Sequence, residues 1–167
     1  MDLDLIIDSG IDVSESTYMF PISRTVELVS SNVSELKNKR LLVNVMITSD
    51  AGIQRLNLKW RGKDRPTNIL SFPMFKKDEL FSLVEKGPSV MLGDLVFGHE
   101  ILCSEAKLKN ISLADHISHL TTHGLLHLAG YDHEINDEEA DKMEELEIRL
   151  LAMMGIADPY ITIDARE

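Results

Sequence analysis

Four short apolar runs, each bounded by polar or turn-forming residues, indicate four β-strands along the chain. The second run is rich in leucine and valine and is typical of a buried strand. Pro73 ends the third run, since a proline cannot donate to a sheet ladder, and Gly93 and Gly98 are bend or bulge points within the fourth. The predicted strands cover residues 3–7, 41–47, 68–72 and 90–102.

Apolar residues at helical spacing, together with residues that cap helix ends, predict four helices. Pro21 suits the first helical position of a segment that ends near Ser30. Ser49, Ser112 and Asn136 stand where N-caps belong, and the last two are followed three residues later by an acidic residue, the pattern of a capping pair. The predicted helices cover residues 21–30, 50–60, 113–129 and 137–154.

Four strands interspersed with at least four helices predict an α/β layer fold. No internal repeat, low-complexity tract or linker divides the sequence, and 167 residues suit one domain with a hydrophobic core. We therefore expect a single domain over residues 1–167. The order of the strands in the sheet does not follow from the pattern.

The composition is that of an ordinary globular protein, with 44% apolar and 27% charged residues. No apolar stretch approaches the roughly 18 residues that cross a bilayer, and the acidic start at residues 1–4 is unlike a secretory signal. The single cysteine, Cys103, cannot form an internal disulfide, which agrees with a reducing compartment. We expect a soluble, cytoplasmic protein in which Cys103 is a small buried hydrophobe.

The formal net charge of −11 is unusual for a protein that binds nucleic acid, because such binding normally relies on clustered Lys and Arg. The charge is unevenly distributed, however. Residues 55–65 hold five cations and one acid, whereas acids dominate residues 132–147. Screening confines each surface charge to about 8 Å at physiological salt, so a basic surface on this acidic protein is feasible.

Five of the six histidines lie within eighteen residues, and three of them can meet at one metal ion. His123 and His127, four residues apart, lie on one face of the predicted helix. Gly130 permits the chain to turn back, which brings His133 toward the same point. Three neutral imidazoles around Zn²⁺ leave a fourth position for water and lower its pKa to about 7, as in catalytic zinc sites. We predict one zinc ion per chain.

The eleven residues from His123 to His133 resemble the signature of the YbeY family, bacterial rRNA maturation factors described as zinc-dependent single-strand endoribonucleases. The acidic last helix is similar to that family as well, and the likeness extends over about residues 46–160. The other matching segments are residues 60–64, 67–73, 93–96 and 158–160.

This resemblance implies a mixed, mostly parallel sheet flanked by helices, with the three motif histidines as zinc ligands and Arg61 as the active-site arginine. An arginine fork matches phosphate oxygens, so Arg61 is expected to bind a substrate phosphate or stabilise the transition state. The implied substrate is single-stranded RNA, in particular precursor rRNA during 16S 3′-end maturation and ribosome quality control. The implied partners are the small ribosomal subunit and its assembly factors, with neither DNA nor a membrane expected.

The histidine spacing also overlaps the metzincin protease motif, His-Glu-x-x-His-x-x-Gly-x-x-His, so the predicted metal helix is metzincin-like. Gly124 stands where the protease carries its general-base glutamate. Proton transfer contributes about 10²–10⁴-fold, so a metallopeptidase-like hydrolase is the weaker alternative. A second alternative is a non-catalytic ribosome-assembly factor that uses zinc to hold its fold; the open fourth position argues against it.

Other polar residues near the motif have both structural and functional interpretations. We assign His119 to packing or to hydrogen bonding behind the ligands, because a pair of residues 119 and 123 would lie a turn further from His133. Asp132 and Glu134 suit a ligand-orienting or basic role, but we favour their membership of an acidic turn. Two further histidines are expected to be ordinary and partly exposed: His99 and His116.

Overall fold

The computed structural model describes residues 1–161 and contains one four-stranded sheet, in the order β1-β2-β4-β3. β1, β2 and β4 are parallel, and β3 pairs antiparallel with β4 at the edge. The mixed, mostly parallel sheet and its flanking helices confirm the predicted α/β fold. The single-domain boundary at residues 1–167 stays a prediction. The strands are β1 (Asp2–Ile7), β2 (Leu41–Thr48), β3 (Ile69–Pro73) and β4 (Val90–Gly98).

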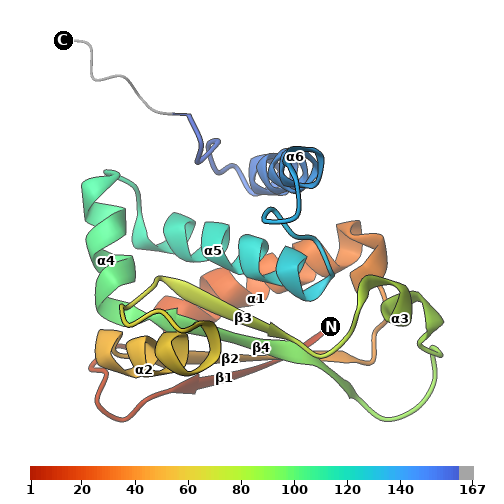
Figure 1. Ribbon diagram of the computed structural model, residues 1–167, viewed down its shortest axis with the longest axis horizontal. Coiled ribbons are helices and arrows are strands. Elements are labelled where there is room, and N and C mark those ends of the chain that lie inside the picture. The colour runs from red at the N-terminus through yellow and green to blue at the C-terminus, as the bar shows by residue number, and fades with distance from the viewer. Residues whose placement is uncertain (162–167) are drawn as a thin grey trace.

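Helices cover both faces of this sheet (Figure 1). α1 and α5 pack together on one face, α2 lies against the other, and α6 packs on α5 on the side away from the sheet. None of the helices in the described residues is long and apolar enough to cross a membrane. The helices are α1 (Glu15–Asn32), the 3₁₀ turn η1 (Ser34–Leu36), α2 (Asp50–Arg61), α3 (Lys77–Ser82), α4 (His99–Leu108), α5 (Leu113–Leu128) and α6 (Asp137–Met153).

The main hydrophobic core lies between the sheet and the pair α1 and α5. Alternate residues of β2, such as Val43 and Val45, point into it and are at most 1% exposed. Leu125 of α5 is fully buried in the same core. A smaller cluster around Ile53 and Val96 holds α2 against the opposite face. α5 is therefore fixed along one side by the sheet, which makes it a rigid support for the side chains on its other side.

The predicted caps of three helices are confirmed. The Ser49 hydroxyl accepts a hydrogen bond from the Gly52 N–H, at 3.1 Å, and begins α2. The Ser112 hydroxyl accepts from the Asp115 N–H at 3.0 Å, and begins α5. Asn136 does the same for α6 through the Glu139 N–H. Each side chain satisfies a donor that the first helical turn leaves free.

Two predicted segments differ from the structure. Pro21 is not the first residue of a helix but the seventh residue of α1, which begins at Glu15, directly after its N-cap Ser14. The predicted strand at residues 90–102 ends at Gly98, and α4 follows directly. Leu102 and Ala106, one helical turn apart, are the buried residues of α4 and account for its packing. Gly93 is confirmed as a bulge, because the register between β2 and β4 shifts beside it.

Candidate metal centre

Three histidines converge on one point beside α5. His123 and His127 come from successive turns of that helix, and His133 comes from the segment that follows it. One nitrogen of each ring lies within 4.8 Å of one nitrogen of each of the others. The ring centroids are separated by 4.7, 4.9 and 5.3 Å. The structure therefore brings together all three residues that the spacing selected.

The turn that returns His133 to the helix depends on Gly130. Its backbone has φ of +90°, in the left-handed region that residues with a Cβ rarely adopt. A Cβ at this position would also lie 2.7 Å from the Cβ of Lys77. The Tyr131 N–H donates to the Leu126 carbonyl at 3.0 Å and closes the helix end. Both the reversal and the close approach of α3 thus require glycine.

Hydrogen bonds at the Nδ1 atoms set the orientation of two of the rings. Nδ1 of His127 lies 3.0 Å from the carbonyl oxygen of Tyr131, and Nδ1 of His123 lies 3.2 Å from Oε2 of Glu147. Carbonyl and carboxylate oxygens only accept hydrogen bonds, so each Nδ1 must carry the hydrogen. In the neutral rings, each Nε2 then presents a lone pair.

These two lone pairs face each other, as two nitrogen ligands of one metal ion would. Nε2 of His123 and Nε2 of His127 are 3.1 Å apart. Two acceptors at that distance repel unless a cation lies between them. Nitrogen ligands about 2.0–2.1 Å from a tetrahedral zinc ion would be about 3.3 Å apart, close to the observed spacing. The donor set and its geometry therefore fit a zinc-sized ion.

The surroundings of His127 also keep its imidazole neutral. Burial, and then the neighbouring rings of His123 and His133, lower the pKa of His127 to about 4. A metal ligand must be deprotonated, and this imidazole is so at neutral pH.

Behind the cluster lies a buried carboxylate that the sequence analysis did not select. Glu147 of α6 is 1% exposed, and its Oε1 lies 2.7 Å from Nε2 of His119. Burial alone would raise the pKa of Glu147, but its contacts with His119 and His123 outweigh burial and lower it to about 2. His119 thus contacts the acid behind the ligands, as expected. The sequence does contain a signal for this residue. Glu147 follows Met143 by one helical turn, so it is an acid at a position on the apolar face of α6.

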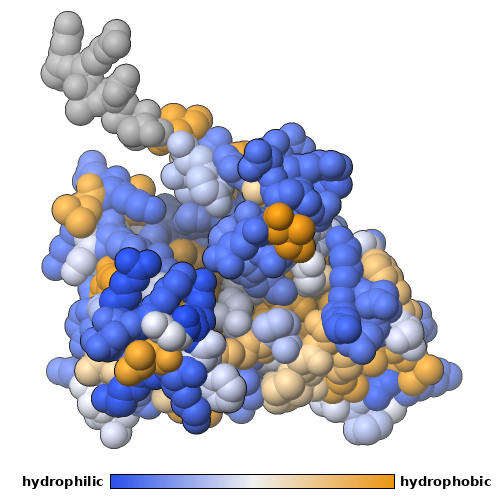
Figure 2. All heavy atoms as spheres, in the orientation of Figure 1, coloured by the Kyte–Doolittle hydropathy of each residue, from blue (hydrophilic) through white to orange (hydrophobic). Residues whose placement is uncertain are grey.

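A cavity of about 920 Å³ opens in front of the histidines. Its walls are the end of α2, the free edge of β3, the start of α3, and the segment after α5. Figure 2 shows the recess between α2 and α6, with hydrophilic residues on both sides. The lining includes all three histidines together with Arg61, Asn68, Lys77, Asp132, Glu134 and Tyr160.

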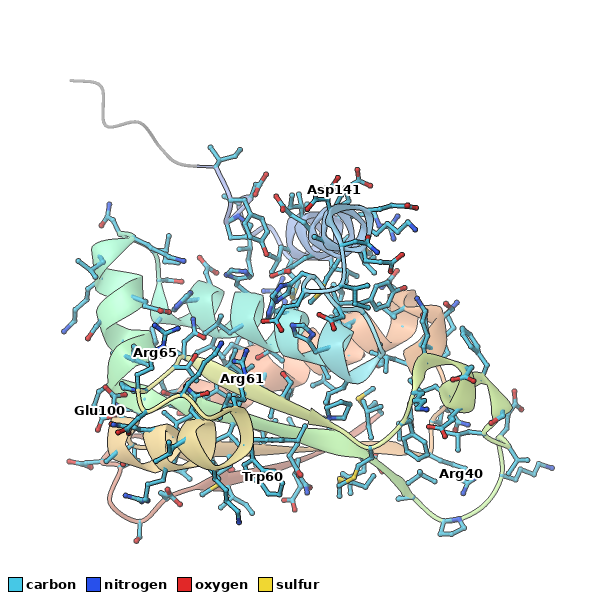
Figure 3. All side chains as sticks on the ribbon, viewed as in Figure 1. Arg40, Trp60, Arg61, Arg65, Glu100 and Asp141 are labelled. Carbon is cyan, nitrogen blue, oxygen red and sulfur yellow. The ribbon has the colours of Figure 1, made fainter. Side chains whose placement is uncertain are left out.

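Arg61 reaches this cavity from the last turn of α2. In Figure 3, Arg61 and Arg65 lie on the side of α2 that faces α5. The guanidinium of Arg61 lies 3.4 Å from a carboxylate oxygen of Glu134, and both side chains are well exposed. An ion pair this exposed is worth at most about 1 kcal/mol, so Arg61 is readily available to another anion. The cations of residues 55–65 are all exposed, as a basic surface requires.

Two expectations outside the cluster are corrected. His116 is not partly exposed but fully buried, with Nε2 2.7 Å from Oε2 of Glu105, because this contact joins α5 to α4. Cys103, in the middle of α4, is only half-buried, and the buried residues of that helix are Leu102 and Ala106. His99 is partly exposed, as predicted. Neither His116 nor His99 contributes to the cluster.

Gly124 faces the sheet. A Cβ there would lie 2.7 Å from Cδ2 of Leu95 and 2.9 Å from Cδ1 of Ile69. The glycine therefore lets α5 approach the strands closely. The position has no space for the carboxylate that a metzincin protease carries at this point of the motif.

Comparison with known proteins agrees with this geometry. The family model described as "Endoribonuclease YbeY" matches residues 8–155. An Endoribonuclease YbeY of Novosphingobium aromaticivorans is 44% identical over 165 residues, covering 98% of this chain and 96% of that protein. The Endoribonuclease YbeY of Erythrobacter litoralis is 51% identical over 125 residues, covering 75% and 78%. The solution structure of TM1509 from Thermotoga maritima is similar in fold, with a TM-score of 0.55 at 22% identity over 99% of both chains.

Proposed function

The chain belongs to the YbeY endoribonuclease family, and on that premise we propose that it is a zinc-dependent enzyme that hydrolyses single-stranded RNA. The single observation that carries the metal role is the pair of Nε2 lone pairs that face each other at 3.1 Å. His123, His127 and His133 would hold one zinc ion per chain. A zinc ion with three such ligands supplies a Lewis acid and lowers the pKa of bound water to about 7.

In this proposal Arg61 binds the substrate phosphate. Its guanidinium lines the same cavity as the histidines, and its contact with Glu134 is long and exposed. A phosphate oxygen offers a charge-assisted hydrogen bond worth about 1.5–3 kcal/mol, more than the exposed pair with Glu134. Arg61 would therefore exchange its carboxylate partner for the scissile phosphate and offset the charge that builds there during cleavage.

The size of the cavity favours a flexible single strand. A volume of about 920 Å³ is within the range of small-molecule sites, so it admits a few nucleotides but not a duplex. The histidine rings lie inside this recess, His127 half-buried and His133 more exposed. A strand that can bend its backbone inward reaches them, whereas the phosphates of a rigid helix do not. The exposed cations of residues 55–65 would hold the backbone outside the recess.

The biological setting follows from the family resemblance. We propose precursor rRNA as the substrate, with 16S 3′-end maturation and ribosome quality control as the processes. The proposed partners are the small ribosomal subunit and its assembly factors, and the proposed compartment is the cytoplasm, where those particles form.

Three variants test the chemistry. His127→Ala should lose both bound zinc and cleavage of a synthetic single-stranded RNA, because one of three ligands is gone. Arg61→Ala should keep its zinc but cleave about 10- to 150-fold more slowly, the equivalent of 1.5–3 kcal/mol. Arg149→Ala is the matched control, since Arg149 is an exposed arginine of α6 outside the cavity lining and outside the basic segment. Equal cleavage by metal-free and zinc-loaded protein would refute the proposal.

The non-catalytic alternative makes a different prediction in cells. If the protein only assists assembly, a folded, zinc-loaded Arg61→Ala variant should restore normal rRNA processing to cells that lack the wild-type chain. We expect that variant to fail, while Arg149→Ala succeeds.

A further inference from the structure

Glu147 is the buried acid nearest to the histidine cluster, and its partners are unusual for a charge at 1% exposure. Buried carboxylates normally pair with Lys or Arg. Within residues 1–161, the ion-pair partners of Glu147 are two imidazoles, His119 and His123, and no lysine or arginine. The hydroxyl of Tyr160 completes the set, donating to Oε2 at 2.9 Å. His123 and Tyr160 form hydrogen bonds to Oε2, whereas His119 contacts Oε1 at ion-pair distance without hydrogen-bond geometry.

The contact with His123 has a direct effect on that ring. Oε2 of Glu147 lies 3.2 Å from Nδ1, so the hydrogen of the neutral imidazole is held at Nδ1. The opposite nitrogen, Nε2, is then unprotonated and directed at His127 and the centre of the cluster. Without this acceptor, the ring would be free to carry its hydrogen at Nε2, where it would block a metal.

The carboxylate is itself held from two sides. His119, one turn before His123 on α5, contacts Oε1 at 2.7 Å. Tyr160 follows α6 and contacts Oε2, and its ring lies edge-on to His119 with centroids 6.0 Å apart. Oε2 of Glu147 is therefore held by a hydrogen bond from the segment after α6, and Oε1 lies at ion-pair distance from α5. A side chain so constrained has one orientation available for His123.

We propose that Glu147 is a positioning residue for the metal centre, which holds His123 in the tautomer and orientation that bind the ion, and that Tyr160 holds Glu147 in turn. This inference rests on the proposed metal role of the histidines. Carboxylates that orient metal-bound imidazoles typically change metal affinity by about 10–100-fold when they are mutated.

The central test compares Glu147→Gln with Glu145→Gln. Both substitutions remove one negative charge from α6, but within residues 1–161 the exposed Glu145 forms no ion pair with the histidines, unlike Glu147. The dissociation constant for zinc is measured by competition with a chromogenic chelator at neutral pH. Glu147→Gln should raise it about 10–100-fold, because an amide presents donors to neighbours that also donate. Glu145→Gln should leave it within twofold of the wild type.

Two further measurements do not depend on the folding of Glu147→Gln. In metal-free wild-type protein, nitrogen NMR of the imidazoles should show the His123 hydrogen at Nδ1. Tyr160→Phe, which alters a half-exposed residue, should weaken zinc binding less than Glu147→Gln but more than the control. Zinc binding by Glu147→Gln equal to that of Glu145→Gln, or a wild-type His123 hydrogen at Nε2, would overturn the inference. Failure of the wild type itself to bind zinc would instead refute the proposed function.

Discussion

Gly124→Ala tests whether the close approach of α5 to the sheet requires a glycine at this position. The added methyl group would lie 2.7 Å from Cδ2 of Leu95, 2.9 Å from Cδ1 of Ile69 and 3.3 Å from Cδ1 of Leu95. Carbon atoms in favourable contact are about 3.5–4.0 Å apart, so the nearest contact is about 1 Å too short. Leu95 is fully buried and Ile69 is 9% exposed, so neither has open space to move into.

Two opposing terms set the size of the effect. Alanine is a better helix former than glycine by about 0.8–1.0 kcal/mol, which favours the variant. Overpacking a tight core typically costs about 1–3 kcal/mol, which opposes it. Because two contacts lie below 3.0 Å, overpacking should win, and we expect a net loss of about 1 kcal/mol in the free energy of unfolding. For a chain of this size that lowers Tm by about 2–4 °C.

Urea unfolding of a double-mutant cycle with Leu95→Val isolates the cause. Valine has no Cδ atoms, so it removes two of the three short contacts while it suits a strand. In the Leu95→Val background, Gly124→Ala should therefore cost less, or even stabilise the protein, through helix propensity. A Gly124→Ala variant that is more stable than the wild type, or equally costly in both backgrounds, would refute the packing argument.

Three other outcomes are expected. Gly130→Ala should lower the free energy of unfolding by about 1–2 kcal/mol and weaken zinc binding, because a Cβ at φ +90° strains the turn to His133. Urea unfolding measures the stability and chelator competition the zinc affinity; an unchanged affinity would contradict this prediction. Zinc at a hundred times its dissociation constant should add about 2.7 kcal/mol and raise Tm by about 5–11 °C in calorimetry, whereas no shift would exclude binding to the native state. Burial would raise the pKa of Glu35, but hydrogen bonds from Ser34 and its own backbone, and then Lys77, lower it, so native stability should decline as the pH falls below about 4.5. Glu35→Gln should flatten that decline in urea unfolding at pH 7 and 3.5, and an unchanged slope would contradict it.

The parts of this molecule that local signals govern were predictable from the sequence. The caps Ser49, Ser112 and Asn136 act within three residues, so their roles depend on short-range backbone geometry. The convergence of the histidines likewise depends on one helical turn and one reversal at Gly130. A span of eleven residues contains almost all of the information that this geometry requires.

The parts that depend on tertiary contacts were not predictable in this way. His116 was expected to be exposed because nothing in its neighbourhood along the chain indicates that α4 would place Glu105 against it. Glu147 was overlooked for the same reason, as its partners lie 24 and 28 residues earlier in the chain. α4 was missed because apolar residues resume at Ile101 and Leu102 soon after the strand, and periodicity over so short a run does not show where a strand gives way to a helix.

The order of the elements along the chain has a consequence for biosynthesis. The four strands of the described residues lie within residues 2–98, whereas the first two histidines of the cluster arrive with α5, and Glu147 and Tyr160 arrive later still. Because translation proceeds from the N-terminus, the sheet and its first helices can form on the ribosome before any complete cation site exists. A nascent chain of this protein thus acquires its structural platform first, and the residues of the candidate site come together only after α5 and α6 have been translated.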